Sequence, residues 1–116
     1  MQDWFAVDVC GLAPGEMRAV AVAGRDVLVC HAEGAFYALE NRCPHAATPL
    51  TSGRLRGLVL ECPLHGGKLD VRDGRPCAPP IRSPANTFAV RRAGASIEIR
   101  LEGLRSPSAR CAGAEP

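Results

Sequence analysis

Two short groups of cysteine and histidine residues are the part of this sequence best suited to chemistry. The first is Cys43-Pro44-His45 and the second is Cys62-Pro63-Leu64-His65, with sixteen residues between His45 and Cys62. For a thiol and an imidazole this close in sequence to reach one bound group, we expect the backbone to turn in a tight loop at each pair. Pro44 and Pro63 restrict the backbone beside each cysteine, as such a loop requires. The pattern therefore predicts a metal site built from two loops.

Two cysteines and two histidines are compatible with more than one metal. A Cys₂His₂ set can complete a tetrahedron around zinc, although zinc-binding domains usually pair cysteine with cysteine and histidine with histidine. Here each cysteine is followed by a histidine. That order suits a binuclear iron centre in which Cys43 and Cys62 hold one iron and His45 and His65 hold the other. Zinc and two unconnected Cys/His pairs remain the alternatives at this point.

The rest of the chain must position these loops, and its pattern is that of an all-β domain. Short apolar segments of strand length recur between turn signals, and no segment has the periodicity of a convincing amphipathic helix. The expected strands are 5–9, 17–22, 27–31, 35–39, 88–92 and 97–101, with a short hairpin over 55–61 and a segment 69–71 that leads into a tight turn at 72–74. We therefore expect an antiparallel sandwich or small barrel with a cluster-binding subdomain of two ligand loops.

Length and composition predict one small domain. The chain has 116 residues, of which 47% are hydrophobic and 22% charged, values that are ordinary for a globular protein. We expect the domain to cover residues 1–102, with the ligand loops within 41–80. Residues 103–116 are rich in Ser, Ala, Pro and Gly, so a disordered tail is expected there.

Several classes of function are disfavoured by the same composition. A formal net charge of +2 without a run of Lys or Arg does not predict nucleic-acid binding. No apolar segment approaches the roughly 18 residues of a membrane span. The N-terminus lacks a basic region followed by an apolar one, so no secretion signal is visible. We expect a cytoplasmic protein that binds neither nucleic acid nor membrane, and a monomer.

The remaining candidate residues have plainer interpretations. Four further cysteines are scattered, and in a reducing cytosol they are expected to be free, partly buried thiols: Cys10, Cys30, Cys77 and Cys111. Cys30 falls in an apolar strand and His31 has no partner at metal spacing, so we expect a core residue and a structural or exposed histidine. Four cations flank the loops as a solvated rim or as a face that steers an acidic partner: Arg42, Arg54, Arg56 and Lys68.

The spacing C-x-H-x₁₆-C-x₂-H, within the motifs C-P-H and C-P-L-H-G, resembles that of the Rieske family. The similarity covers most of the chain, from about Phe5 to Leu101. Among the branches of the family, the chain is most similar to the small Rieske ferredoxins of bacterial aromatic-ring-hydroxylating dioxygenases. The resemblance implies one [2Fe–2S] cluster, with cysteines on the inner iron and histidines on the outer iron. It also implies a one-electron carrier, rather than an enzyme, between a flavin-containing ferredoxin reductase and a terminal oxygenase.

Other functions remain open at this stage. The chain could be the small subunit of an assimilatory nitrite reductase, a detached piece of an oxygenase, or a zinc-stabilised interaction module. An oxygenase needs a mononuclear iron site such as two histidines and a carboxylate. Because His31 is the one histidine outside the two groups, the chain cannot supply that site alone.

The resemblance also predicts a low reduction potential. Replacing two anionic thiolates by neutral imidazoles raises the potential from roughly −400 mV to about −150 to +300 mV. High-potential relatives tie their loops with a disulfide and place hydroxyl donors against the cluster, and hydrogen bonds that stabilise the reduced state raise the potential. Neither feature is present here, since the corresponding positions hold Thr48, Leu64, Gly67 and Leu69. We therefore expect a value near the low end, about −150 mV.

Two details of the resemblance concern loop shape. The family often has glycine two residues after the first histidine, where this chain has Ala47. If that backbone has a positive φ, alanine costs about 1 kcal/mol. Residues 77–80, Cys-Ala-Pro-Pro, form a stiff segment that either covers one side of the cluster or is an ordinary connector.

Overall fold

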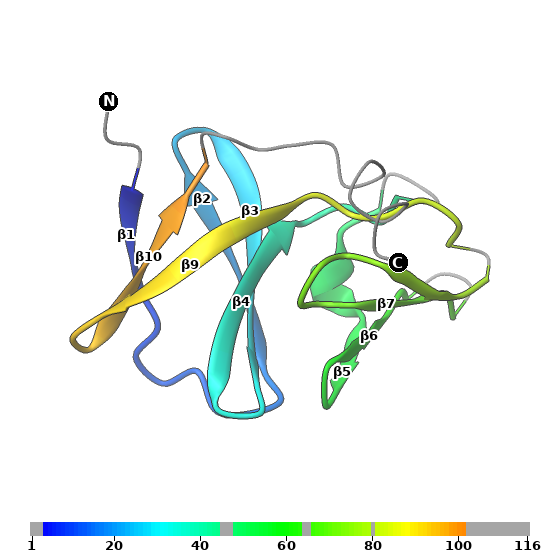
Figure 1. Cartoon of the computed structure of the whole chain (residues 1–116), viewed down its shortest axis with the longest axis horizontal. Helices are drawn as coiled ribbons and strands as arrows, with labels where there is room; N and C mark the ends of the chain where they lie inside the picture. The colour runs from blue at the N-terminus through cyan, green and yellow to red at the C-terminus, as the bar shows by residue number, and fades with distance from the viewer. Residues whose placement is uncertain (1–3, 45–47, 64–65, 80, 102–116) are drawn as a thin grey trace.

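The computed structural model describes residues 4–44, 48–63, 66–79 and 81–101, and strands dominate this part of the chain (Figure 1). One short 3₁₀ helix, η1 (Leu50–Ser52), accompanies them. The strands are β1 (Trp4–Asp8), β2 (Met17–Val22), β3 (Arg25–Ala32), β4 (Ala35–Glu40), β5 (Arg54–Arg56), β6 (Val59–Glu61), β7 (Lys68–Asp70), β8 (Pro76–Ala78), β9 (Thr87–Ala93) and β10 (Ser96–Arg100).

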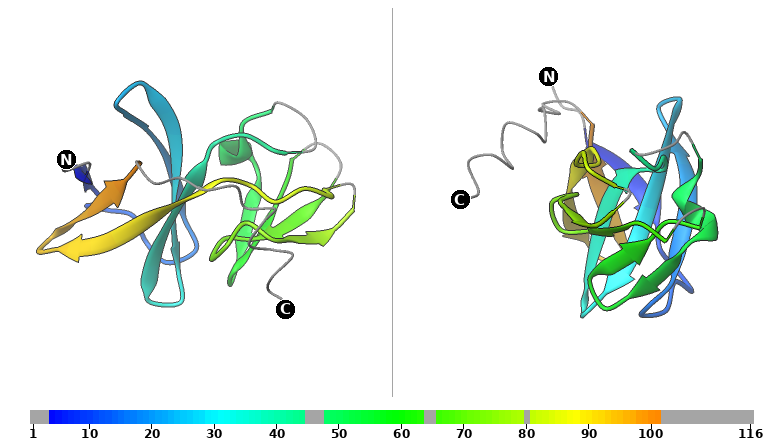
Figure 2. Two further views of the ribbon diagram at one scale, coloured as in Figure 1. Left: turned by 45° about the horizontal axis from the view of Figure 1, so that its top comes forward. Right: turned by 90° about the vertical axis from the view of Figure 1, so that its right-hand side faces the viewer.

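The strands form two antiparallel sheets. Six strands form the larger one, here called the barrel sheet, in the order β1-β10-β9-β4-β3-β2. Four strands form the other, here called the small sheet, in the order β5-β6-β7-β8. The small sheet lies at one end of the molecule and the β9–β10 hairpin at the other, while the barrel sheet curls around its own interior (Figures 1 and 2).

Tight two-residue turns set the register of the barrel sheet. The β2–β3 turn consists of Ala23 and Gly24, with φ angles of 50° and 80°. The β3–β4 turn consists of Glu33 and Gly34, with φ angles of 52° and 81°. Two successive positive φ values are those of a type I′ turn, whose twist matches that of the flanking strands. Both turns fall between strands that the sequence analysis expected, 17–22, 27–31 and 35–39.

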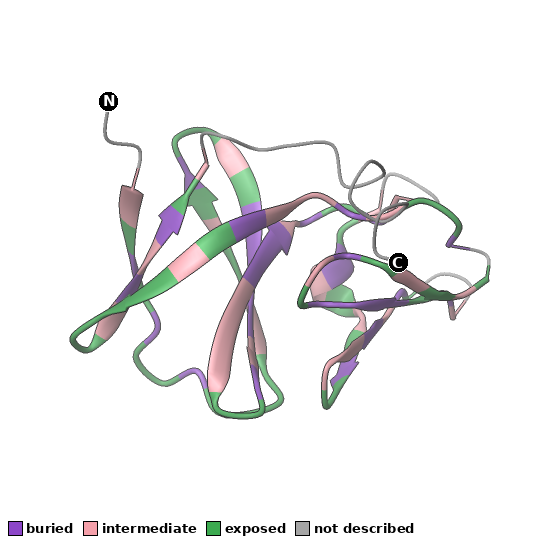
Figure 3. Ribbon diagram, viewed as in Figure 1, coloured by how far each residue is buried: buried purple, intermediate pink, exposed green. Residues whose placement is uncertain are grey.

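Strands β3 and β4 are buried on both faces and separate two apolar cores (Figure 3). Because side chains alternate along a strand, Val27 and Val29 enter one core while Leu28 and Cys30 enter the other. The barrel core consists of Val7, Val9, Leu12, Val22, Val27, Val29, Ala38, Phe88, Ile97 and Ile99. The small-sheet core consists of Leu28, Cys30, Ala32, Leu39, Cys43, Leu50, Leu55, Leu60, Cys62, Leu69, Val71, Ile81 and Ala85.

The small sheet is built from strands of only three residues, yet its register aligns one apolar row. Leu55 of β5 lies opposite Leu60 of β6, which lies opposite Leu69 of β7. All three leucines are buried and belong to the small-sheet core. The residues on either side of them in sequence point to the opposite face. One face of the small sheet therefore packs on β3 and β4, and the other is free to carry polar groups.

The all-β architecture confirms the sequence-based prediction of fold class, with two additions. The sequence analysis missed η1, and it treated Cys77 and Ala78 as an extended loop, whereas they belong to the edge strand β8. Proline at the start of that strand is compatible with an edge position. Residues 102–116 lie outside the described residues, so the boundary at 102 and the tail stay predictions. Among the described residues no helix is long and apolar enough to span a membrane.

Candidate metal centre

The two predicted cysteine ligands follow strands of different sheets. Cys43 comes three residues after β4, and Cys62 directly follows β6. Their exposed fractions are only 1% and 3%, and both belong to the small-sheet core. The fold therefore brings two thiols, distant in sequence, into the same apolar environment, where the sequence analysis predicted one site.

The two loops that begin at these cysteines are closed by equivalent hydrogen bonds. The backbone N–H of Cys43 donates to the carbonyl of Thr48 at 2.8 Å. The backbone N–H of Cys62 donates to the carbonyl of Gly67 at 2.7 Å. In both cases the carbonyl belongs to the fifth residue after the cysteine. His45 and His65 fall within these two sequence intervals, but both lie outside the described residues, as does Ala47.

A buried asparagine holds the first loop to the barrel sheet. Asn41 is 7% exposed, and its side-chain oxygen accepts the backbone N–H groups of Leu50 and Thr51 at 2.8 and 3.1 Å. Its amide nitrogen donates to both carboxylate oxygens of Asp26, each at 3.2 Å. Its own backbone N–H donates to the Asp26 carbonyl at 3.0 Å. Asn41 thus links the start of β3 to the far end of the loop that contains Cys43.

Close backbone packing holds the second loop. A Cβ atom on Gly67 would lie 2.7 Å from Cγ1 of Ile81, a distance that real contacts of this kind do not show. A Cβ atom on Gly53 would lie 2.1 Å from the backbone oxygen of Glu61, the residue before Cys62. Glycine at these two positions lets the neighbouring segments approach the second cysteine from both sides.

A buried carboxylate closes the turn beyond the second loop. Asp70 is 5% exposed and accepts hydrogen bonds from the backbone N–H, Nε and Nη2 of Arg72 at 2.9, 3.1 and 2.7 Å. Nη2 of Arg75 lies 3.6 Å from the same carboxylate. The hydrogen bonds from Arg72 hold the pKa of Asp70 below its usual value. The carboxylate therefore stays ionised and anchors the β7–β8 connection.

Sequence reasoning did not find the roles of Asn41 and Asp70. An aspartate directly before a Val-Arg-Asp-Gly turn is a recognisable signal for side-chain bonding to the turn backbone, and it points to Asp70. No comparable local signal marks Asn41, because its hydrogen-bond partners lie nine and fifteen residues away.

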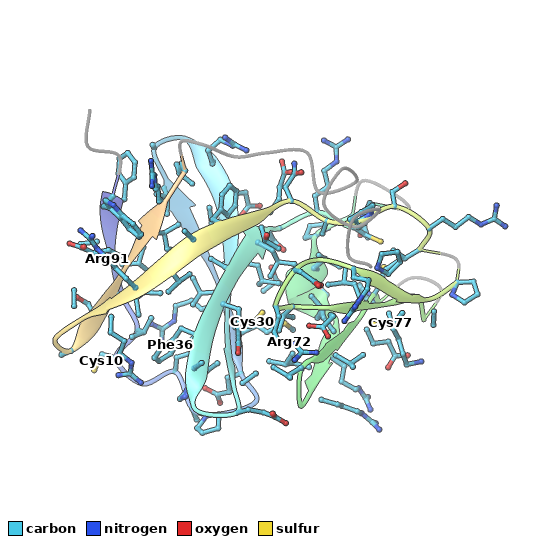
Figure 4. The ribbon with its side chains drawn as sticks, viewed as in Figure 1. Cys10, Cys30, Phe36, Arg72, Cys77 and Arg91 are labelled. Atoms are coloured by element: carbon cyan, nitrogen blue, oxygen red, sulfur yellow. The ribbon has the colours of Figure 1, made fainter. Side chains whose placement is uncertain are left out.

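The other cysteines and His31 are not predicted ligands, and the structure shows the surroundings of four of these five residues. Cys30 is fully buried, and burial raises the pKa of its thiol to about 12, so it remains a neutral core residue as predicted (Figure 4). Cys10 and Cys77 are exposed, so the prediction of partly buried thiols is wrong for these two. Cys111 lies outside the described residues. The ring of His31 stacks on Phe36 with centroids 4.3 Å apart, and its Nδ1 lies 2.8 Å from the Leu12 carbonyl, a structural role as predicted.

The described half of the site fits an iron–sulfur centre. Two thiols at the end of one apolar core can act as thiolate ligands to an inner iron, which must be shielded from water. Loops closed by equivalent hydrogen bonds and braced by Asn41 and Gly67 supply the rigidity that such a centre needs.

The family assignment is decided by comparison with known proteins. Residues 3–89 match the model of the Rieske [2Fe–2S] domain. The chain belongs to the Rieske [2Fe–2S] family. This assignment confirms the cofactor inferred from the sequence, one Rieske-type [2Fe–2S] cluster, and replaces the zinc alternative.

Relatives of this Rieske domain are electron-transfer components. The chain is 40% identical over 92 residues to the ferredoxin component of biphenyl 2,3-dioxygenase from Rhodococcus jostii (strain RHA1), covering 79% of this chain and 86% of the relative. Its fold matches the ferredoxin of carbazole 1,9a-dioxygenase from Nocardioides aromaticivorans IC177 with a TM-score of 0.77 and 35% identity, over 82% and 93% of the two chains.

A further match is to a chain in a structure titled as the complex of reduced oxygenase and oxidised ferredoxin in carbazole 1,9a-dioxygenase. The TM-score is 0.79 at 32% identity, over 86% of this chain and 94% of the other. These relatives confirm the prediction of a Rieske ferredoxin that carries electrons rather than an enzyme. They leave the identity of the four ligand residues, taken from the motif, as a prediction.

Proposed function

We propose that this Rieske domain is a cytoplasmic one-electron carrier in an aromatic-ring dioxygenase system. It accepts electrons from a flavin-containing ferredoxin reductase and delivers them to a terminal Rieske oxygenase. The observation that carries the proposal is the pair of buried cysteines at the start of two equivalently closed loops. The similarity to ferredoxin components of biphenyl and carbazole dioxygenases supports the choice of system.

The proposed ligands are the four residues of the two sequence motifs. Cys43 and Cys62 hold the inner iron as thiolates, and His45 and His65 hold the outer iron through one ring nitrogen each. When bound, the cluster takes up and releases one electron at a time. The thiols are already buried in an apolar core, so the chain supplies the low-dielectric side of the site without rearrangement.

The protein's own contribution is rigidity. Leu50 and Thr51 are fixed to Asn41 by two hydrogen bonds to its side-chain oxygen, and Gly67 is packed against Ile81. Because both loops are held at their far ends, little backbone needs to move when the charge of the centre changes. Small movement favours rapid electron exchange, which suits a carrier that meets two partners in turn.

The reduction potential is expected to be low. The position where high-potential relatives have a serine hydroxyl is Gly67, and Ile81 occupies the space where a side chain would begin. Without that donor the reduced cluster lacks one stabilising hydrogen bond. We expect a midpoint near −150 mV, and a redox titration that gives a positive value would contradict this expectation.

Reconstitution tests the proposed function. The purified protein should be red-brown, contain two irons and two acid-labile sulfides per cluster, and give a Rieske-type EPR signal after reduction. With the reductase and the oxygenase of a biphenyl dioxygenase system, adding the protein should raise product formation in proportion to its concentration. The Cys62→Ser variant serves as the matched control and should support no turnover. Absence of iron and acid-labile sulfide from freshly prepared protein would overturn the proposal.

A further inference from the structure

Charge is distributed unevenly between the two ends of the molecule. Residues 42–82, which include both ligand loops and the small sheet, contain seven Arg or Lys and three Asp or Glu. The other described residues, 4–41 and 83–101, contain five Arg and six Asp or Glu. The formal balance is therefore +4 at the end that carries the site and −1 at the other end.

Most of the cations at the site end have no internal partner. Asp70, the buried carboxylate, is already occupied by Arg72 and Arg75. Five other cations are exposed and form no ion pair with any described residue: Arg42, Arg54, Arg56, Lys68 and Arg82. Because like charges repel one another, this surplus does not stabilise the small sheet. The surplus instead attracts negatively charged molecules that approach this end of the protein and repels positively charged ones.

The register of the small sheet places part of this charge on its outer face. Arg54 of β5 lies opposite Glu61 of β6, which lies opposite Lys68 of β7. Side chains directly opposite each other on neighbouring strands share a face. The single carboxylate in this row therefore has a cation on each side. Arg56, two residues after Arg54, points to the same side of the sheet.

A hollow on this side connects the cations to the second ligand loop. Its volume is about 580 Å³, and its lining includes Arg54 and Arg56 of β5. Cys62, Pro63 and Gly66 of the second loop also line it, together with Glu61. Described residues of the second ligand loop and two arginines therefore line the same hollow.

We infer that this hollow and the cations around it form the docking surface for an acidic face of the terminal oxygenase. The inference rests on the proposed function, because electron transfer requires a partner to come close to the ligand loops. Arg54 and Arg56 line the hollow beside that approach and form no competing ion pair with the part of the chain that the structure describes. Charges at the rim of an interface act mainly by speeding encounter and excluding wrong partners.

Two small oxidants of opposite charge test the sign of the charge on this surface in the holoprotein. The dithionite-reduced protein is mixed in a stopped-flow instrument with hexacyanoferrate(III), an anion, or with hexaammineruthenium(III), a cation. Raising the ionic strength from about 10 mM to about 300 mM should slow the reaction with the anion by about tenfold and accelerate that with the cation. Attraction and repulsion are both screened by salt, so the two dependences must have opposite signs.

Paired charge reversals locate the surface. The double variant Arg54→Glu and Arg56→Glu should reduce the low-salt rate constant for the anion by about fivefold to tenfold, relative to that for the cation. The matched control reverses Arg92 and Arg100, which are exposed on β9 and β10 at the other end without ion pairs, and should change the ratio by less than about twofold. Because a changed reduction potential affects both oxidants in the same direction, the ratio isolates the electrostatic part.

The outcomes separate this inference from the function on which it rests. Equal salt dependences for the two oxidants, or equal effects of the two double variants, would overturn the docking surface while leaving the electron carrier intact. Failure to transfer electrons to either oxidant would overturn the proposed function, and the docking surface with it. The double variant Arg54→Gln and Arg56→Gln should give about half the effect, and it retains the test if the glutamate variant loses its cluster.

Discussion

The two sides of strands β3 and β4 are held together in different ways. On one side, the barrel core is filled by valine, isoleucine and phenylalanine from strands of five to eight residues. On the other side, the small sheet has strands of three residues, and the small-sheet core contains three buried cysteines: Cys30, Cys43 and Cys62. Two buried polar residues, Asn41 and Asp70, lie at its margins. The interior of the barrel sheet is therefore stabilised by apolar packing, whereas the small sheet also depends on the buried polar side chains of Asn41 and Asp70 and on a bound group.

Removing one of the proposed cysteine ligands should separate the two sides most strongly. In Cys62→Ser we expect complete loss of the cluster, because the inner iron loses one of its two proposed thiolate ligands. Since a metal centre contributes its binding free energy to folding, amide exchange in β5–β7 should then accelerate by about a hundredfold or more, whereas β3 and β4 retain most of their protection. Iron analysis and hydrogen-exchange mass spectrometry measure the two effects.

The matched control for this change is Cys77→Ser, which removes an exposed thiol from β8 of the same sheet. It should retain full iron content and unchanged exchange rates. Equal acceleration of exchange in both sheets of Cys62→Ser would show that the barrel sheet is not independent of the cluster.

Loss of the Asn41 side chain should have the next largest effect. In Asn41→Ala the N–H groups of Leu50 and Thr51 lose their shared acceptor, and the former bond is buried. Leaving a buried donor unsatisfied costs about 1–3 kcal/mol, and the partly buried donor of Thr51 costs less, so we expect a loss of about 2–4 kcal/mol in the free energy of unfolding. Denaturant unfolding, followed by visible absorption and by far-UV circular dichroism, measures it.

The comparison variant for Asn41→Ala is Asn86→Ala. Asn86 is only partly buried and makes one side-chain bond, to Glu40 at 2.8 Å. Its loss should cost about 1 kcal/mol or less. If the two alanine variants prove equally stable, the hydrogen bonds of Asn41 do not determine how the first loop is held.

The buried carboxylate of Asp70 predicts that the stability of the small sheet depends on pH. Because the folded-state pKa of Asp70 is lowered, its contribution is fully present above the unfolded value of 3.8 and is lost as the pH falls through the lower folded value. Asp70→Asn should therefore destabilise the protein by about 2 kcal/mol above pH 5, since bonds to charged groups contribute about 1.5–3 kcal/mol.

The difference between Asp70→Asn and the unmodified protein should shrink at pH values below 3.8. Asp73→Asn is the control, since the Asp73 side chain is 41% exposed and its ion pair with Nε of Arg75 is 4.0 Å long. The hydrogen bond that Asp73 accepts from the backbone N–H of Arg75 at 3.0 Å can also be accepted by the side-chain oxygen of asparagine. That variant should show less than about 0.5 kcal/mol of change at any pH. A difference for Asp70→Asn that stays constant down to pH 2.5 would contradict the assigned role.

The barrel sheet could be predicted from sequence because its determinants are local. The run from Val27 to Cys30 is apolar at every position, which is typical of a strand buried on both faces. Gly24 and Gly34 mark two-residue turns, and the flanking apolar segments set the register. Each of these signals spans fewer than about ten residues, so no knowledge of distant contacts was needed.

The surroundings of the site could be predicted only in part. The cysteine and histidine spacing predicts the ligand loops, because chemistry restricts which residues can bind iron, and the four ligand residues stay a prediction. The bracing of those loops was not visible, since Asn41 acts on residues nine and ten positions away and Gly67 is packed against Ile81, fourteen positions on. The edge strand β8 was missed because proline and short length are weak strand signals.

A double-mutant cycle sharpens the account of close packing beside the second loop. Gly67→Ala should cost about 1–3 kcal/mol in unfolding free energy, because the new methyl group meets Cγ1 of Ile81 at 2.7 Å. Ile81→Ala alone should also destabilise, by opening a cavity. In the double variant the two changes should compensate by at least about 1 kcal/mol, since each removes the other's defect. Strict additivity in denaturant unfolding would refute direct contact as the reason for glycine at this position.

The smallest expected effect lies in the barrel sheet and has the opposite sign. Ala23 adopts a φ of 50° at the first position of the β2–β3 turn, which alanine tolerates poorly. Ala23→Asn creates the Asn-Gly pair that type I′ turns prefer, so we expect a gain of about 0.5–1 kcal/mol and a rise of several degrees in Tm. Ala23→Val should instead lower Tm, because a β-branched side chain is strained at this φ. Neither variant should alter the visible spectrum or the midpoint potential, since the turn lies outside the small-sheet core. A spectral change in either one would show that strain at this turn reaches the ligand loops across β3.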